Sequence, residues 1–329
     1  MKRIFITGGS GCIGHYMAES LIQETQHELF FLVRNPKKVG FDWRSRSGVN
    51  IVHGDLREID RFADLLKTID VAILAASAWG GTAEVFDINV NKTTRLMNLL
   101  DAEKCEQILY FSTASILNQN NQILKEASEL GTDYIRSKYD CLTQLPRLEI
   151  ASKITVLFPT LVFGGNGKNK PYSHISSGFV DAMKWISLAR WFKADGSFHL
   201  VHAQDIAGVV KYLVAHPIPY NVIDQLDDIY LKQLVLGSKP MTVNEMIKEG
   251  CQYLGKRIYL QIPLSMWLAN ILINVFRIQL APWDRFCMNY RHFTYKNPVL
   301  PSSFGESDFC PTFSDLLRIS GVKGRRIKN

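Results

Sequence analysis

Three glycines between a strand pattern and a helix pattern constrain the fold of this chain more than any other short feature. Gly8, Gly11 and Gly14 follow the apolar run Ile4–Ile6 and enter a stretch, Cys12–Glu24, with helical periodicity. Glycine permits a sharp turn there, and the amino end of the following helix offers N–H groups and a positive dipole end to a phosphate. The spacing is G-x-x-G-x-x-G rather than the usual G-x-G-x-x-G, so the turn alone predicts either a nucleotide site or a structural β-to-α connection.

The rest of the first half repeats the strand-then-helix rhythm. Strand-like runs are RIFITG, HELFFLVR, VNIVHGD, DVAILAAS, QILYFSTAS and ITVLFPTLVFG. Helical patterns are expected at 12–24, 58–67, 82–102 and 128–149, and later at 174–190 and 203–215. This alternation predicts an α/β fold with a parallel sheet covered by helices on both faces. A capping box, with Thr242 as N-cap and Glu245 three residues on, predicts a further helix start.

Composition limits the classes of protein that the chain can be. Its 329 residues, 47% hydrophobic and 21% charged, suit one large globular domain or two modest ones. The six cysteines form no C-x-x-C pair or zinc spacing, which favours a reduced, cytoplasmic protein without a metal site. The net charge of +7 is read as scattered surface lysines and a basic tail, because no nucleic-acid module is visible; attraction for an anionic cofactor or substrate is the other reading that stays open.

The most apolar stretch runs from Leu264 to Trp283. Polar residues interrupt it too often for a transmembrane span, which favours a buried or pocket-lining helix. Trp267 and Trp283 bracket the stretch and leave a peripheral membrane contact open.

The end of the second strand bears on cofactor choice. In dinucleotide-binding folds an acidic residue there binds the ribose 2′-hydroxyl of NAD, whereas a cation accommodates the 2′-phosphate of NADP. This chain has Arg34, followed by Lys37 and Lys38. The sequence therefore favours NADP, with NAD as the alternative.

An ordered series of motifs resembles the extended short-chain dehydrogenase/reductases, the NAD(P)-dependent epimerase/dehydratase superfamily. The series covers most of residues 3–216 and is more specific than any one of its members. Its elements are TGGSGCIG, HGDL, AILAAS, NVNKT, YFSTAS, YIRSK, FPTLVFG (with Phe158 in place of the family's usual arginine) and FHLVHAQDIA.

The resemblance implies a Rossmann doubly wound parallel sheet with a smaller C-terminal substrate lobe. The Rossmann domain would comprise residues 1–164 plus about 196–238, and the lobe about 165–195 plus 239–329. It further implies dinucleotide contacts from residues of the glycine turn and of the strand ends: Gly8, Ser10, Gly11, Cys12, Ile13, Gly14, Arg34, Asp55, Leu56, Ala75, Ala76, Lys138 and Pro159.

The resemblance also implies a catalytic set of Thr113, Tyr134 and Lys138. Tyr134 and Lys138 are four residues apart and so share one helix face. A tyrosine acting as general acid/base near neutrality needs a pKa well below its ordinary value of about 10, which the ammonium of Lys138 would promote. Thr113 would hydrogen-bond the reacting oxygen, with Ser112 and Ser115 as alternatives; Thr113-Ala114-Ser115 lacks the acidic pair of the sugar dehydratases, so dehydration is not expected.

Four further residues receive weaker predictions. Asn89 is expected to order the catalytic strands, and Asp205 to anchor a helix of the substrate domain. His202 and Cys12 are each read as packing residues, with substrate contact and a redox switch as the respective alternatives.

The predicted function is NADP-dependent oxidation or reduction of a carbonyl/alcohol pair on a small-molecule substrate. The alternatives are an NAD-dependent nucleotide-sugar epimerase and a non-catalytic cofactor-sensing protein. A nucleotide sugar and an apolar carbonyl compound both remain open as substrate, and a homodimer is a family expectation only.

Overall fold

The structure, a computed structural model, describes residues 1–218, 225–226, 229–275 and 279–325. Its centre is a seven-stranded sheet with every neighbouring pair parallel, in the order β13-β6-β5-β4-β1-β2-β3. The chain starts at β1 and returns to it at β4, so the strand order reverses between β1 and β4, where doubly wound folds bind ligands. The strands are β1 (Arg3–Thr7), β2 (Glu28–Val33), β3 (Val49–His53), β4 (Val71–Leu74), β5 (Gln107–Phe111), β6 (Ile154–Pro159) and β13 (Lys232–Leu236).

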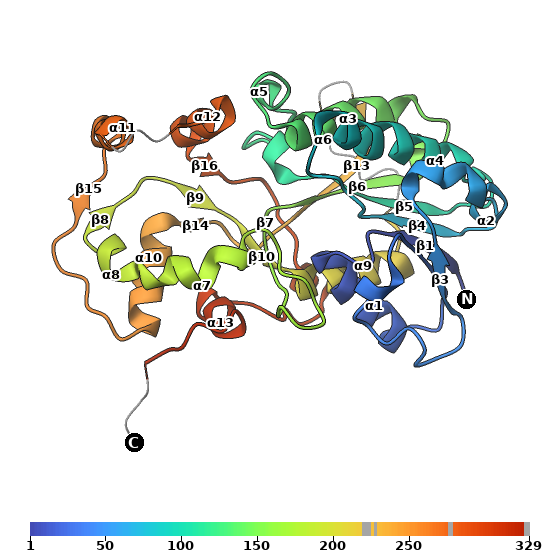
Figure 1. The fold of residues 1–329 in the computed structure, drawn as a ribbon, viewed down its shortest axis with the longest axis horizontal. Helices are drawn as coiled ribbons and strands as arrows, with labels where there is room; N and C mark the ends of the chain where they lie inside the picture. Colours follow the sequence, from blue (N-terminus) through green and yellow to red (C-terminus); the bar gives the residue numbers. More distant parts are fainter. Residues whose placement is uncertain (219–224, 227–228, 276–278, 326–329) are drawn as a thin grey trace.

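Helices cover both faces of this sheet, as the alternating pattern predicts (Figure 1). The side chains of β1 alternate between two cores: Phe5 belongs to one and Ile6 to the other. The first core packs under α4 (Thr93–Leu99) and α6 (Asp133–Gln144), and the second under α1 (Cys12–Glu24) and α9 (Ala203–Ala215). The Rossmann fold class is therefore confirmed, and two helices, α1 and α9, begin and end where the sequence predicts.

The remaining elements form a smaller lobe beside the carboxyl edge of the sheet (Figure 1). Two strand pairs and a three-stranded sheet, β14-β9-β16, run through it. The division of residues between domain and lobe stays a prediction. The elements outside the central sheet and its covering helices are β7 (Leu161–Phe163), α7 (Ser176–Lys184), α8 (Ile186–Ala189), β8 (Phe192–Lys193), β9 (Ser197–Phe198), β10 (Leu200–His202), β14 (Met241–Thr242), α10 (Val243–Tyr253), β15 (Ile262–Pro263), α11 (Met266–Val275), α12 (Pro282–Tyr290), β16 (His292–Phe293) and α13 (Phe313–Ile319), with β11 (Gln225–Leu226) and β12 (Ile229–Tyr230) as a separate pair; of these, β7, β9 and β10, like the pair β11 and β12, fall within the ranges predicted for the Rossmann domain.

Several predicted helices are broken in the structure. The pattern at 82–102 becomes α3 (Thr82–Phe86), a π-helical segment at Asp87–Lys92 and then α4; the pattern at 128–149 becomes α5 (Lys125–Glu129) and α6; the pattern at 58–67 becomes a 3₁₀ segment at Leu56–Phe62 and α2 (Ala63–Leu66). Periodicity reports which face is apolar and does not report these local changes of pitch. The capping box of Thr242 and Glu245 is present at α10.

The structure does not show the single buried or pocket-lining helix expected across residues 264–283: of the side chains that it describes in this stretch, only that of Trp283 is buried. The chain forms α11 and the start of α12 there, and residues 276–278 lie outside the described part. The Trp267 side chain is 73% exposed, because α11 lies at the outer end of the lobe, while Trp283 is buried and lines the cavity described below. Among the described residues, no helix has the length and apolar character needed to cross a bilayer.

Candidate active site

The glycine turn connects β1 to α1 in a shape that other residues cannot adopt. Gly8 has φ +80°, and a Cβ at this position would come within 2.5 Å of the Ala75 carbonyl carbon. A Cβ on Gly14 would lie 2.0 Å from the Gly8 carbonyl oxygen. Gly11 is the N-cap of α1 and offers no side-chain cap, so the helix amino end presents backbone N–H groups. This cradle fits the pyrophosphate of a dinucleotide.

The loop after β4 is fixed in place by side chains from two other elements. The Thr7 hydroxyl accepts a hydrogen bond from the Ala76 N–H at 3.2 Å. The fully buried Asn89 amide bonds both backbone groups of Ala78, at 2.8 and 3.0 Å, and donates to the Ser137 hydroxyl of α6 at 2.9 Å. The predicted ordering role of Asn89 therefore has a physical basis, since it ties the β4 loop to the helix that carries Tyr134.

Tyr134 and Thr113 meet at the carboxyl edge of the sheet. Thr113 follows β5, and its hydroxyl hydrogen-bonds the Tyr134 side chain. The same hydroxyl accepts from the Ser115 N–H at 3.3 Å and so caps a short 3₁₀ turn. Burial raises the pKa of Tyr134 above its ordinary value, and the bond from Thr113 opposes that shift. Of the three candidate hydroxyls, Thr113 is the one that the structure brings to Tyr134.

Lys138 is buried behind Tyr134 rather than in the cavity. Its ammonium donates to the Phe111 carbonyl oxygen at 2.8 Å and lies 5.9 Å from the centre of the Tyr134 ring. Burial lowers the pKa of Lys138 to about 8. Lys138 is not among the groups that shift the pKa of Tyr134 in this arrangement: desolvation raises that pKa and outweighs the one opposing contribution, the bond from Thr113.

A cationic group marks the other end of the site. The Arg34 guanidinium is 67% exposed and lies 3.9 Å from both the Asp55 and Glu84 carboxylates. Asp55 itself pairs closely with Arg57 at 2.8 Å, and the Arg57 side chain lowers the pKa of the Asp55 carboxyl. The guanidinium of Arg34 is thus only loosely held and faces the cavity entrance.

One cavity of about 1330 Å³ connects the glycine turn, the Arg34 end and Tyr134. All of the predicted site residues line it except Lys138. Pockets that hold one drug-sized ligand measure about 300–1,000 Å³, so this cavity exceeds that range and has room for a dinucleotide and a second ligand together.

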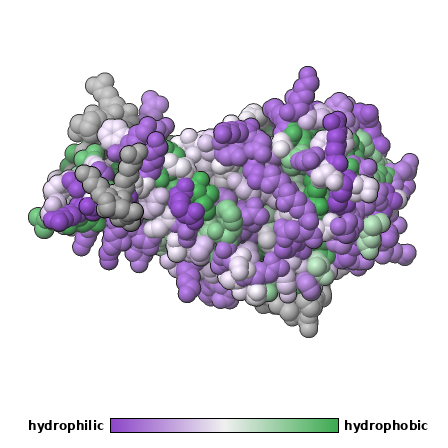
Figure 2. Space-filling model, turned by 90° about the horizontal axis from the view of Figure 1, so that it is seen from below, coloured by the Kyte–Doolittle hydropathy of each residue, from purple (hydrophilic) through white to green (hydrophobic). Residues whose placement is uncertain are grey.

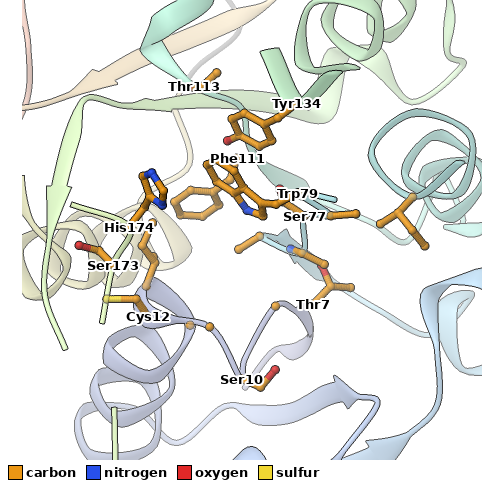
Figure 3. Close-up of a pocket in the computed structure, with 18 of the residues that line it drawn as sticks. Thr7, Ser10, Cys12, Ser77, Trp79, Phe111, Thr113, Tyr134, Ser173 and His174 are labelled. Atoms are coloured by element: carbon orange, nitrogen blue, oxygen red, sulfur yellow. The ribbon is translucent and has the colours of Figure 1, made fainter. Parts of the chain in front are cut away.

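The motifs of the sequence do not predict the aromatic wall of this cavity. Trp79 stacks on Tyr134 with the ring centroids 3.8 Å apart, and His174 lies parallel to Trp79 at 6.0 Å (Figure 3). Tyr172, Ser173 and Ser77 also line the cavity. Its position in the sequence could have indicated Trp79, because Trp79 lies in the loop that follows the carboxyl end of β4, where ligand-binding residues gather.

Three other predicted residues have packing roles in the structure. The His202 imidazole accepts from the Gln204 N–H at 3.1 Å, and burial lowers its pKa to about 4. Asp205 accepts from the Phe309 and Cys310 N–H groups at 2.6 and 3.2 Å, which joins α9 to the C-terminal segment. Burial raises the pKa of the Cys12 thiol to about 11, which disfavours a thiolate switch.

The fold and the site together define an enzyme of the extended short-chain dehydrogenase/reductase type. The model of the NAD dependent epimerase/dehydratase family matches residues 4–222, and the chain belongs to this family. No curated protein sequence matches the chain.

Solved structures show the same fold at low sequence identity. The Bordetella bronchiseptica enzyme WbmG, in complex with NAD, is 14% identical with a TM-score of 0.64, covering 97% of this chain and 93% of that one. UDP-N-acetylglucosamine 4-epimerase from Methanobrevibacter ruminantium M1, in complex with UDP-N-acetylmuramic acid, is 17% identical with a TM-score of 0.56, covering 80% and 85%. dTDP-glucose 4,6-dehydratase from Bacillus anthracis, in complex with NAD, is 13% identical with a TM-score of 0.59, covering 97% and 96%.

Proposed function

We propose that this enzyme interconverts nucleotide-linked sugars by oxidising and re-reducing one carbon, as an epimerase does. Epimerisation thus takes the place of net carbonyl reduction, the function predicted from the sequence, because the family match and the solved structures favour nucleotide-sugar chemistry. The observation that carries the proposal is the placement of the Tyr134–Thr113 pair in the same cavity as the glycine turn, with room for two ligands. The run Thr113-Ala114-Ser115 lacks an acidic pair and so does not favour dehydration.

A nicotinamide dinucleotide would be held by the glycine cradle at its pyrophosphate and by Arg34 at its adenosine ribose. Bound there, it supplies reversible hydride acceptance. Tyr134 takes the proton from the substrate hydroxyl and returns it, and Thr113 orients the reacting oxygen through its hydroxyl. Lys138 lies 5.9 Å from the Tyr134 ring centre with its ammonium on the Phe111 carbonyl oxygen, and its depressed pKa makes that nearby positive charge sensitive to pH.

Arg34 favours NADP over NAD as the resident dinucleotide. Its guanidinium is exposed and only loosely paired, which suits a 2′-phosphate. The same observation supports a second candidate function, an NADPH-dependent carbonyl reductase.

Cofactor extraction and a sugar assay distinguish the two functions. We expect dinucleotide to be released from the purified protein on denaturation, and a panel of UDP- and dTDP-sugars to yield an epimer by NMR without added NAD(P)H. Tyr134→Phe should retain dinucleotide and lose about 10²–10⁴-fold in rate. Stoichiometric NADPH consumption with carbonyl compounds, and no epimer from any sugar, would establish the reductase instead.

A further inference from the structure

The outer end of the smaller lobe exposes a cluster of large apolar side chains. We define the outer patch as Trp185, Leu188, Tyr259, Leu260, Ile262 and Trp267, whose exposed fractions lie between 54% and 82%. Figure 2 shows hydrophobic residues at this end of the molecule, which is the end where α8, β15 and α11 lie in Figure 1. Large exposed apolar clusters on a folded protein mark an interaction surface.

The patch is one continuous piece of structure. β8 and β15 pair in parallel, with Ile262 opposite Phe192, and the Ile262 N–H donates to the Trp191 carbonyl oxygen at 2.8 Å. The Trp191 ring stacks on that of Tyr259 with the centroids 6.1 Å apart, and the backbone N–H of Trp191 donates to the Leu188 carbonyl oxygen at 3.1 Å. Trp267 follows in the first turn of α11. Two segments, far apart in the sequence, thus build one apolar end.

The charge of these two segments has a single sign. Residues 184–194 and 256–275 contain five cationic residues, Lys184, Arg190, Lys193, Lys256 and Arg257, and no acidic residue. In the described part of the chain, the flanking Asp181 and Asp195 pair with Lys184 and Arg291, and no ion pair involves Lys193 or Arg257, both of which are exposed. Among the described residues, two exposed cations beside the outer patch, Lys193 and Arg257, therefore have no acidic partner, whereas Lys184 has one.

We propose that the outer patch docks the enzyme on the surface of an anionic lipid bilayer. Tryptophan and tyrosine are the side chains that settle at the lipid–water interface, and nearby Lys and Arg add attraction to anionic headgroups. The contact is peripheral, because no helix among the described residues can cross a bilayer. A second copy of the chain fits less well, since a self-complementary contact would bring the same cations together.

Vesicle flotation with the full chain tests this proposal. We expect binding to vesicles of phosphatidylcholine mixed with phosphatidylserine, much weaker binding to phosphatidylcholine alone, and loss of binding at high salt. Trp185→Ser/Trp267→Ser should abolish flotation. Lys193→Gln/Arg257→Gln should weaken it roughly thirtyfold, at about fivefold for each charge.

The controls are matched exposed residues outside the lobe. Leu130→Ser on α5's edge and Lys67→Gln beside α2 should leave flotation unchanged, and circular dichroism with thermal melting should confirm that every variant is folded. Absence of flotation by the wild type, or flotation that survives both patch variants, would overturn the proposal. So would a concentration-dependent dimer that Trp185→Ser/Trp267→Ser dissolves in the absence of vesicle binding. The assay needs no dinucleotide or sugar, so its result is independent of the proposed function.

Discussion

The indole of Trp79 lies flat on the ring of Tyr134, with the planes 10° apart and the centroids 3.8 Å apart. Trp79 is 62% exposed, so it covers one face of the tyrosine while its own outer face remains open to the cavity. In Figure 3 it lies between Tyr134 and the turn that carries Ser10 and Cys12. Any ring that approaches this face of Tyr134 must therefore meet Trp79 first.

Removing the indole should lower the pKa of Tyr134. Burial is the main cause of its raised pKa, and Trp79→Ala lets water reach the ring, whereas Trp79→Phe keeps it covered. Alkaline titration of the tyrosine absorbance, with Tyr134→Phe subtracted to isolate this residue among twelve, measures the difference. Equal pKa values in Trp79→Ala and Trp79→Phe would show that the stack does not control hydration of the phenol.

Gly14→Ala should abolish dinucleotide binding. Its Cβ would lie 2.0 Å from the Gly8 carbonyl oxygen, so the turn must open, at a cost of about 1–3 kcal/mol in folding free energy. Calorimetric titration with NAD and NADP measures the loss. The matched control is Gly178→Ala in α7, where an added Cβ has open space, and it should bind as the wild type does. Normal dinucleotide binding by Gly14→Ala would contradict the proposal that the glycine turn holds the pyrophosphate.

Lys138 should make the protein more stable as the pH rises above about 8. Its pKa is lowered by burial from 10.5 to about 8, so between these values the unfolded chain holds a proton that the folded chain has released. Stability therefore rises with pH in that window, by up to about 3 kcal/mol for this group, and is flat below it. Urea unfolding across the window should show this gain in wild type and in Lys67→Met, but not in Lys138→Met. The same change in unfolding free energy with pH in all three proteins would refute this prediction.

Arg34→Ser should weaken NADP binding and spare NAD. The guanidinium is an exposed cation that lines the cavity, as is the ammonium of Lys38, and charge-assisted hydrogen bonds to a phosphate contribute about 1.5–3 kcal/mol, which is roughly a tenfold or greater rise in Kd. Lys37→Ser is the matched control, since Lys37 is exposed nearby and does not line the cavity. If NAD binds more tightly than NADP and Arg34→Ser changes neither, the cofactor is NAD.

Much of the site was predictable because its residues follow strands. In a parallel sheet every carboxyl end lies at the same edge, so Gly8, Ala75 and Thr113 had to converge once their strands were recognised. The YIRSK motif places Tyr134 on a helix that follows β5 in the chain, now α6. The pKa values of Tyr134 and Lys138 could not be predicted from the sequence. Burial raises the first and lowers the second, and this burial comes from neighbours distant in the sequence.

Local pattern determined the alternation of strands and helices, the helix bounds of α1 and α9 and the glycine turn, because each depends on contacts or backbone angles within a short segment. The tertiary structure alone decided that Trp79 covers Tyr134, that Lys138 turns to the Phe111 carbonyl and that Trp267 is exposed. Those outcomes depend on which surfaces the rest of the chain leaves free, and hydrophobicity along a segment does not record what packs against it.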